Sequence, residues 1–437
     1  MNDLRRLAEE LRTLNADMTR CMRCGFCQAH CPVYGETLRE FDVSRGKIAL
    51  LAGTADELLR DAAAVAARLD RCLLCGSCQA NCPSGTPALS IFIRARSIMT
   101  AYTGLSPVKK LVFRSLLPRP RLFDLALRIG SLFQGLVLRA VPGSAQGTVR
   151  APLLSPLIGA RHMHGLPRKP LHALYPDLNI PAANGKPTVL LYPGCMADRM
   201  YVSVGQACIK ALRHHGAGVR MPSNLVCCGL PALASGDAAG FTLQVRRNIA
   251  ILQQYSFEYI TTPCGSCTAA MAEMWPEMGD FTGDERAYLR ALAGKTLDIN
   301  ALLVDVFNAR PAQPDPAAPI VTFHEPCHLR NSLKVTAQPR TLIRAAGHEI
   351  REMDECGRCC GCGGSFTLFH YDISRSIGQR KRDMIVDTGA PVAATACPAC
   401  MMQLNDALSR NGDKVRVMHS VELYAASLPD EPAGSTE

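Results

Sequence analysis

Four cysteines with the spacing C-x2-C-x2-C-x3-C, followed by a proline, occur twice in the first hundred residues, at residues 21–32 and 72–83. This run is typical of loops that hold [4Fe–4S] clusters, in which the fourth cysteine of one run binds the cluster of the other. Zinc sites normally use two C-x2-C pairs, so the repeated run favours iron over zinc. The sequence therefore predicts two [4Fe–4S] clusters with crossed ligands. The expected ligands are Cys21, Cys24, Cys27 and Cys82 for cluster one, and Cys72, Cys75, Cys78 and Cys31 for cluster two.

A different cysteine pattern occurs twice in the C-terminal half of the chain. Each copy has one cysteine, then an adjacent pair followed by glycine, and finally a closing C-x2-C. Between the copies, the first three cysteines are shifted by 132 residues and the last two by 133, which predicts two similar lobes. The members are Cys195, Cys227, Cys228, Cys264 and Cys267 in the first copy, and Cys327, Cys359, Cys360, Cys397 and Cys400 in the second.

The first cysteine and the closing C-x2-C of each copy follow apolar runs such as PTVLLYPGC and VAATACPAC. Such runs are typical of buried parallel strands, and helical stretches lie between them. The pattern predicts α/β lobes with the cysteines at the carboxyl ends of strands, where such sheets bind ligands. Five thiolates exceed the need of a cubane, and adjacent cysteines suit two irons of an open cluster. We therefore expect one or two further iron–sulfur clusters of a larger or more open kind; the alternative is that a copy binds zinc or no metal.

These patterns divide the chain into four parts and predict a fold of class α+α/β. Helical periodicity between the first two cysteine runs indicates an α-helical, ferredoxin-like unit with two clusters over residues 1–100. Residues 101–185 contain several prolines and short amphipathic segments, which indicates a basic helical linker with a docking surface. Two pseudo-symmetric cysteine-rich lobes are expected at residues 186–310 and 311–437.

The charge pattern and the N-terminus bear on location and partners. The net charge of the 437 residues is +10, and residues 101–180 hold eleven basic but only two acidic residues. This linker is expected to dock a flavoprotein or the inner face of an anionic membrane, or to be a solvated surface; no nucleic-acid partner is expected. Residues 1–20 lack signal-peptide features and residues 122–141 carry three charges, so a cytoplasmic chain without a membrane span is expected. There, cysteines bind metal more readily than they form disulfides.

Three cysteines and two histidines receive no firm role from the sequence. Cys208 lies within a predicted helix and is expected to be an inert buried thiol. Cys356 and Cys362 flank the adjacent pair of the second copy, and either is an alternative ligand. His324 and His328 flank the first cysteine of the second copy, where a hydrogen bond to a cluster sulfide or a proton relay competes with plain packing beside the site. No catalytic residue is predicted.

Several of these motifs resemble known families. The two N-terminal runs, with about forty residues between them, resemble the α-helical ferredoxin module, and the five-cysteine sets resemble the cysteine-rich CCG domain of heterodisulfide reductase catalytic subunits. With VSRGKIALL after the first run and CPSG at the end of the second, the whole chain resembles the iron–sulfur subunits of glycolate oxidase and of FAD-linked D-lactate dehydrogenases. Some glycolate oxidase subunits lack the cysteine at position 400, so its presence favours a full second site.

The resemblance implies an electron-transfer subunit of an oxidoreductase complex that acts on CH–OH donors. No G-x-G-x-x-G motif follows a predicted strand, and iron–sulfur clusters pass single electrons, so oxidation of a 2-hydroxy acid needs a hydride acceptor elsewhere. The implied partner is a FAD-linked flavoprotein acting on D-lactate or glycolate, and the implied acceptor is a quinone or another redox protein. No flavin is expected in this chain. The alternatives are a heterodisulfide-reductase-like subunit that reduces a disulfide at a non-cubane cluster, and a structural zinc scaffold.

Overall fold

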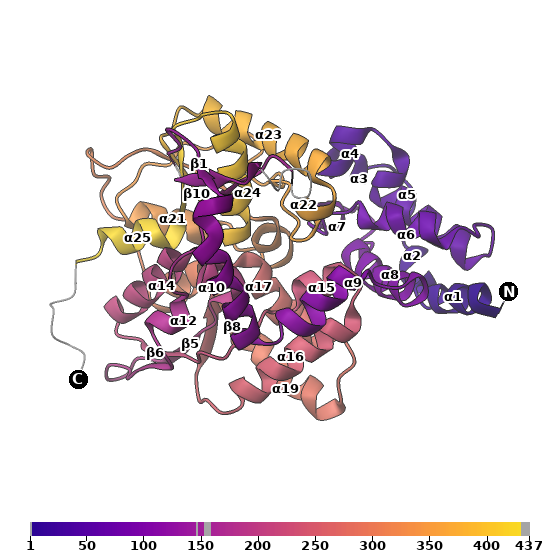
Figure 1. Cartoon of the computed structure of the whole chain (residues 1–437), viewed down its shortest axis with the longest axis horizontal. Coiled ribbons are helices and arrows are strands. Elements are labelled where there is room, and N and C mark those ends of the chain that lie inside the picture. Colours follow the sequence, from indigo (N-terminus) through magenta and orange to yellow (C-terminus); the bar gives the residue numbers. More distant parts are fainter. Residues whose placement is uncertain (1, 146, 153–158, 430–437) are drawn as a thin grey trace.

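A computed structural model describes residues 2–145, 147–152 and 159–429 of the chain. Figure 1 shows a helical unit at the N-terminal end beside a larger body. This larger body contains the five-stranded sheet of the first lobe and the three-stranded sheet of the second lobe. The two sheets share no strand, but helices of the second lobe pack on the first, so the lobes form one body. Among the described residues, no helix combines the length and the apolar character needed to cross a bilayer.

The N-terminal unit consists of helices joined by the cysteine loops, and residues 2–103 contain no strand, as predicted. Leu7 and Leu11 are buried because α1 packs its apolar face against α5 and α8. Proline opens α4, where its missing N–H removes no helical hydrogen bond. The helices are α1 (Asn2–Arg12), α2 (Asn15–Met18), α3 (Cys27–His30), α4 (Pro32–Thr37), η1 (Glu40–Asp42), α5 (Ser44–Ala55), α6 (Ala62–Asp70), α7 (Ser77–Ala80) and α8 (Ala88–Thr103).

The linker contains the expected helices and also a small antiparallel sheet that was not predicted. The strands of this sheet are two or three residues long, too short for a periodic pattern to appear. The sheet packs on the second lobe, where the backbone N–H of His162 donates to a carboxylate oxygen of Asp406 at 2.9 Å. The elements are α9 (Pro107–Lys110), the π-helical η2 (Leu111–Leu116), α10 (Pro120–Val137), β1 (Arg139–Ala140), β2 (Thr148–Arg150), β3 (His162–His164) and α12 (Leu171–Leu174).

The first lobe has a five-stranded sheet in the order β4-β6-β5-β7-β8, in which only the edge strand β4 is antiparallel. Val189, Leu190 and Leu191 of the central strand are fully buried, as a strand covered on both faces requires. Its strands are β4 (Leu178–Ile180), β5 (Thr188–Leu191), β6 (Gly218–Met221), β7 (Tyr259–Thr262) and β8 (Thr296–Asp298). Its helices are α13 (Gly194–Arg199), α14 (Val202–His214), α15 (Leu230–Ala234), α16 (Ala238–Leu252), α17 (Gly265–Ala269), η4 (Ala270–Met274), α18 (Trp275–Glu277), α19 (Gly283–Gly294), α20 (Ile299–Ala301) and η5 (Leu302–Val306).

The second lobe has a three-stranded parallel sheet in the order β11-β10-β9. A single bridge from Val321 to Ile350 lies where the first lobe has β6. Its strands are β9 (Val321–His324), β10 (Val392–Thr395) and β11 (Arg416–His419). Its helices are η6 (His328–Ser332), α21 (Ala337–Ala345), α22 (Phe366–Phe369), α23 (Tyr371–Asp387), α24 (Pro398–Arg410) and α25 (Ser420–Ser427). In both lobes, the first cysteine and the closing C-x2-C follow the carboxyl ends of two neighbouring parallel strands.

Candidate metal centres

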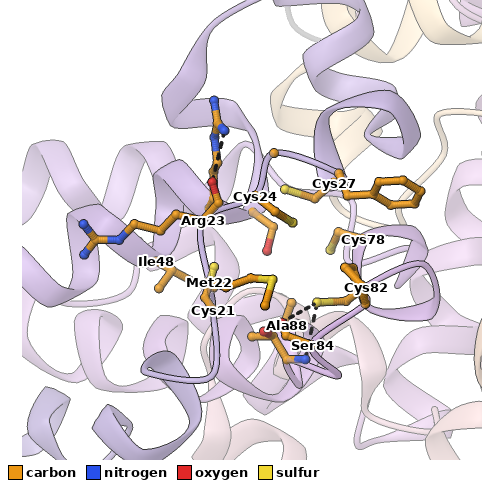
Figure 2. A pocket seen from close by; sticks show the side chains of 16 residues that line it. Cys21, Met22, Arg23, Cys24, Cys27, Ile48, Cys78, Cys82, Ser84 and Ala88 are labelled. Atoms are coloured by element: carbon orange, nitrogen blue, oxygen red, sulfur yellow. Dashed lines mark hydrogen bonds between the residues drawn. The ribbon is translucent and has the colours of Figure 1, made fainter.

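The first pocket of the N-terminal unit is lined by sulfur atoms from both cysteine runs (Figure 2). Three of the cysteines come from the loop that leads into α3, and Cys82 approaches from the end of the second run. Gly25 in this loop has a φ of 84°, a conformation that residues with a side chain rarely adopt. The set predicted for cluster one thus lines one pocket, together with one member of the other set. The cysteines that line it are Cys21, Cys24, Cys27, Cys78 and Cys82.

A second pocket in the same unit is lined by the set predicted for cluster two. Cys31 comes from the first run, and the other three cysteines come from the loop between α6 and α7 and from α7 itself. Gly76 in this loop has a φ of 73°, so both cysteine loops turn in the same way. The two pockets therefore exchange their fourth cysteines, the arrangement that the crossed ligation requires. The cysteines that line the second pocket are Cys31, Cys72, Cys75 and Cys78.

The surroundings shift the pKa values of Cys31 and Cys82, the fourth cysteines of the two runs, in opposite directions. Burial raises the pKa of Cys31 to about 12, although the backbone N–H of Tyr34, 3.4 Å from the sulfur, acts against it. Burial also acts to raise the pKa of Cys82, but hydrogen bonds from Ser84 and Thr86 outweigh it and lower the pKa to about 7. A deeply buried thiolate needs a cation beside it, and metal binding supplies that charge.

The segment VSRGK, which follows the first run, supports both pockets with basic side chains. The guanidinium of Arg45 donates to the carbonyl of Arg23 at 3.3 Å, which braces the first cysteine loop from outside. Glu40 holds that guanidinium at 2.5 Å. Lys47, only 1% exposed, lines the second pocket and donates to the carbonyl of Phe41 at 2.9 Å. No role was predicted for this segment. The sequence signal that could have indicated one is a pair of basic residues, two positions apart, between the two cysteine runs.

The five cysteines of the first lobe gather where β5, β6 and β7 end. The side chains contact one another in the order Cys195, Cys227, Cys228, Cys267 and Cys264. Three residues fix the adjacent pair through its backbone. The indole of Trp275 donates to the carbonyl of Cys228 at 2.8 Å, and the amide of Asn248 donates to that of Cys227 at 3.1 Å. The hydroxyl of Tyr192 donates to the carbonyl of Val226.

The five cysteines of the second lobe gather in the same way at the ends of β9 and β10. Their side chains contact one another in the order Cys327, Cys359, Cys360, Cys400 and Cys397. The glycine that follows the adjacent pair is held by Ser374, whose hydroxyl donates to the carbonyl of Gly361 at 2.9 Å. Each predicted five-cysteine set is thus brought together within its own lobe.

Two further contacts join the cysteine groups of different units. The sulfur atoms of Cys264 and Cys397, one from each lobe, are 3.9 Å apart. The thiol of Cys75, which lines the second N-terminal pocket, contacts the thiol of Cys359 in the second lobe. Sulfur contacts therefore run without a break from the N-terminal unit through the second lobe into the first. No sequence pattern indicated this connection.

The cysteines without an assigned role lie in different surroundings. Cys208 is fully buried in α14 among apolar residues. Cys362 is buried beside Cys360, whereas Cys356 is half-buried and accepts a hydrogen bond from Arg340 at 3.5 Å. Cys362 therefore lies next to the five-cysteine set of the second lobe, where an alternative ligand is expected to lie.

His328 connects three parts of the molecule. One ring nitrogen lies 3.0 Å from the hydroxyl of Ser266 in the first lobe, and the other lies 3.3 Å from the carbonyl of Leu74 in the N-terminal unit. Asn331, one turn further on, donates to the carbonyl of Cys75 at 2.8 Å. These hydrogen bonds position the second N-terminal cysteine loop against the second lobe.

Comparison with known proteins adds family information to this geometry. Residues 17–86 match the model of the 4Fe-4S dicluster domain, and residues 189–272 and 321–405 each match the model of the cysteine-rich domain. The chain is therefore an iron–sulfur protein with one dicluster domain and two cysteine-rich domains.

Three relatives narrow this class to a family. A probable glycolate oxidase iron-sulfur subunit from Bacillus subtilis is 28% identical over 426 residues, 93% of both chains. Lactate utilization protein A from Exiguobacterium sp. is 31% identical over 54% of this chain and 96% of that protein. A fumarate reductase (CoM/CoB) from Methanothermobacter marburgensis has a subunit that is 31% identical over 55% of this chain and 46% of that protein. The chain belongs to the family of glycolate oxidase iron-sulfur subunits and lactate utilization proteins A.

Proposed function

We propose that this chain is the electron-transfer subunit of a 2-hydroxy-acid dehydrogenase complex. A FAD-linked flavoprotein partner oxidises D-lactate or glycolate, and a quinone or another redox carrier receives the electrons. The relatives that are named as subunits of oxidases and reductases support this function. Iron–sulfur clusters, when bound, supply transfer of single electrons, so the hydride chemistry and its flavin belong to the partner.

The observation that carries this proposal is the unbroken run of sulfur contacts between the units. Cys75 and Cys359 join the N-terminal unit to the second lobe, and Cys264 and Cys397 join the two lobes. A protein that only folds around metal has no need to bring separate sites into contact. Proximity of the sites favours electron exchange between them.

The cofactors that we propose follow from the donor sets. Two [4Fe–4S] clusters are held by the crossed N-terminal sets, and one or two non-cubane clusters are held by the five-cysteine sets of the lobes. The described geometry fits these groups, because each set lines a common space or forms a continuous cluster of thiols.

We also propose the four-part division at residues 100, 185 and 310, with pseudo-symmetric lobes. Similar pairing of β5 with β7 and of β9 with β10 supports the latter.

The second candidate is direct reduction of a disulfide at a lobe. The contact between Cys264 and Cys397 places the two lobe sites side by side, as such a reaction would require. However, the two residues are 5% and 2% exposed, so a disulfide substrate has little access to them. Burial of the thiols favours electron transfer, which needs proximity but no substrate access.

The face of α10 supports a peripheral contact with an anionic membrane. Arg119, Arg121 and Arg128 are exposed on or beside this helix. A basic helix with an exposed apolar face is typical of segments that lie at an anionic bilayer surface. Membrane contact would bring the chain close to a quinone. The apolar residues, spaced along one face, are Leu122, Leu125, Ile129, Leu132 and Phe133, which are 43–80% exposed.

The dehydrogenase proposal is tested by co-purification from native cells followed by an assay. We expect a flavoprotein in the complex, and we expect electrons from D-lactate or glycolate to bleach the iron–sulfur absorbance only when that flavoprotein is present. Disulfide reduction by the isolated chain at a comparable rate, without a flavoprotein, would establish the second candidate instead.

The membrane contact is tested by vesicle sedimentation. We expect the full chain to bind phosphatidylglycerol vesicles more tightly than phosphatidylcholine vesicles, and we expect the double variant Leu125→Glu, Ile129→Glu to lose most of that binding. The matched control is Leu243→Glu, because Leu243 is exposed on α16 and lies outside the proposed surface. Equal binding of the double variant and the wild type would contradict the contact.

A further inference from the structure

One histidine beside the second-lobe cysteines lacks a hydrogen-bond partner. His324 ends β9 and is fully buried, and neither of its ring nitrogens makes a hydrogen bond within the described part of the chain. Burying a polar group without a hydrogen-bond partner carries a free-energy cost. Such a cost is expected only where the group has another partner, for example a metal ion.

The free nitrogens of His324 lie beside two of the proposed ligands. A ring nitrogen of His324 and the sulfur atoms of Cys360 and Cys400 all lie within 4.8 Å of one another, and all three side chains are buried. Ligands of one tetrahedral metal, with bonds of about 2.0–2.3 Å, lie roughly 3.4–3.8 Å apart. A contraction of roughly 1 Å would therefore suffice for all three to bind one metal atom.

The first lobe has a different residue at the equivalent position. Tyr192 precedes the first cysteine of its lobe by three residues, as His324 does in the second lobe. Its hydroxyl is satisfied, because it donates to the carbonyl of Val226 and so serves to hold the loop of the adjacent cysteines. In the first lobe, this position therefore holds a hydroxyl that donates a hydrogen bond to the backbone. In the second lobe, it holds an imidazole whose nitrogens have no hydrogen-bond partner among the described residues.

We propose that His324 is a nitrogen ligand of the metal centre in the second lobe, where it binds together with Cys360 and Cys400. The first-lobe centre then has only sulfur ligands. This inference rests on the proposed function, because it requires that the second lobe holds a metal. It assigns to His324 a direct role that neither its place in the sequence nor the match to the cysteine-rich domain provides.

A histidine ligand changes the electronic character of the centre. Imidazole is neutral, whereas a thiolate is negatively charged, so a mixed ligand set stabilises the reduced state relative to a set of thiolates alone. Replacement of cysteine by histidine in iron–sulfur centres raises the reduction potential for this reason. With His324 in place of one of the five thiolates at the metal, the second-lobe centre is expected to accept electrons more readily than the first-lobe centre.

The test is pulsed electron paramagnetic resonance on the reduced, full-length protein, prepared anaerobically with ¹⁵N-labelled or unlabelled histidine. The second-lobe signal is identified as the signal that the Cys360→Ser variant loses. We expect this signal to show hyperfine coupling from a directly bound histidine nitrogen. We expect His324→Tyr, which copies the first lobe, to lose the coupling and to lower the midpoint potential.

Two further variants make the result decisive. His328→Asn removes a neighbouring histidine that is held by protein hydrogen bonds, and it should keep the coupling. His324→Cys has a smaller side chain and offers a sulfur ligand in place of the nitrogen. The metal content should therefore persist without the nitrogen coupling, even if the tyrosine variant misfolds. If the centre is zinc, the same contrast is read as a nitrogen neighbour at about 2.0–2.1 Å in zinc absorption fine structure, present in the wild type and lost in His324→Cys.

The outcomes separate the ligand assignment from the proposed function. A second-lobe signal without nitrogen coupling, or a coupling that survives in His324→Cys, overturns the ligand assignment and leaves the proposed function intact. Full metal content and an unchanged spectrum in Cys360→Ser would show that the second lobe holds no metal. That result would overturn the ligand assignment together with the second-lobe site of the proposed function.

Discussion

The two cysteine-rich lobes share their cysteine spacing but differ in the residues behind the cysteines. In the first lobe, the neutral amide of Asn248 holds the adjacent pair. The equivalent position of the second lobe has Lys381, which is 1% exposed and donates to the carbonyl of Glu355 at 2.8 Å. A buried ammonium stabilises negative charge on its neighbours. From this comparison we expect the proposed centres of the two lobes to differ in their affinity for an electron, although their cysteine spacing is the same.

The lobes also differ in the part of the chain that each contacts beside its first cysteine. In the first lobe, Arg199 of α13 pairs with Asp124 of the linker helix α10 at 2.8 Å. In the second lobe, the equivalent residue is Asn331, which binds the carbonyl of Cys75 in the N-terminal unit. The first lobe thus anchors the linker, and the second lobe anchors the N-terminal cysteine loop.

The largest expected effect separates the lobe centres from each other. We expect Cys228→Ser to remove the metal of the first lobe and Cys360→Ser to remove that of the second, because each residue contacts only cysteines of its own lobe set among those assigned. Metal analysis and paramagnetic resonance of the two variants should show complementary losses. Loss of both centres in either variant would mean that the lobes share one centre.

The next effect concerns the crossed ligands of the N-terminal unit. We expect Cys82→Ala to damage the cluster that is held by the first run, and Cys31→Ala to damage the cluster that is held by the second, because each lines the pocket of the other run. Paramagnetic resonance with the iron content of each variant distinguishes the clusters. Damage confined to the cluster of the residue's own run would contradict the crossed arrangement.

A smaller effect concerns pH and the anchoring of the first lobe. Burial acts to lower the pKa of His172, but hydrogen bonds to Asp124 and Asp198 outweigh it and raise the pKa to about 9. Since the folded pKa lies above the unfolded value, the stabilisation is full below about pH 6.5 and is lost as the pH rises through about 9. The free energy of unfolding should fall by roughly 3 kcal/mol across this range through His172.

The control for this pH effect is the variant His172→Gln. Denaturant unfolding of both proteins between pH 6 and 9.5 should show a difference that is largest at low pH and shrinks towards pH 9.5. A constant difference across the range would show that His172 is not charged in the folded protein.

A still smaller effect tests the electrostatic difference between the lobes directly. We expect Lys381→Met to lower the midpoint potential of the second-lobe centre by the equivalent of about 1–2 kcal/mol per electron, as a unit charge roughly 10 Å away does at an effective dielectric constant near 20. The measurement is a redox titration followed by paramagnetic resonance. Lys381→Arg, which keeps the positive charge, should leave the second-lobe potential nearly unchanged, and an equal shift in both variants would show that the charge of Lys381 does not set the potential.

The smallest effect concerns the contact of the second lobe with the N-terminal unit. We expect Asn331→Ala to reduce the free energy of unfolding by about 1 kcal/mol, because its hydrogen bond to the carbonyl of Cys75 is lost. Thermal unfolding measures this change. Asn331→Ser, which keeps a polar but shorter side chain, should have a stability between those of Asn331→Ala and the wild type. If Asn331→Ala is as stable as the wild type, the contact is contradicted.

The parts of the fold that follow local patterns were predictable from the sequence. Helical spacing of Leu7 and Leu11 predicted α1, and apolar runs before Cys195 and Cys397 predicted strands. The sheet of β1, β2 and β3 was missed, because strands this short depend on packing against α24 rather than on their own periodicity.

The grouping of the cysteines into sets could be proposed from the sequence, and the structure brings the members of each proposed set close together. The contact between Cys75 and Cys359 could not be predicted, because it depends on how the N-terminal unit docks on the second lobe. The free nitrogens of His324 could not be predicted either. Their lack of a partner depends on the register that places His324 opposite Thr395 on the neighbouring strand.

The most direct test of the account is Mössbauer spectroscopy of the full-length protein, enriched in ⁵⁷Fe and prepared anaerobically. We expect iron in two cubane clusters that persist in the double variant Cys228→Ser, Cys360→Ser, and further iron that this double variant lacks. A wild-type protein with negligible iron, or with an iron spectrum that the double variant leaves unchanged, would contradict the account.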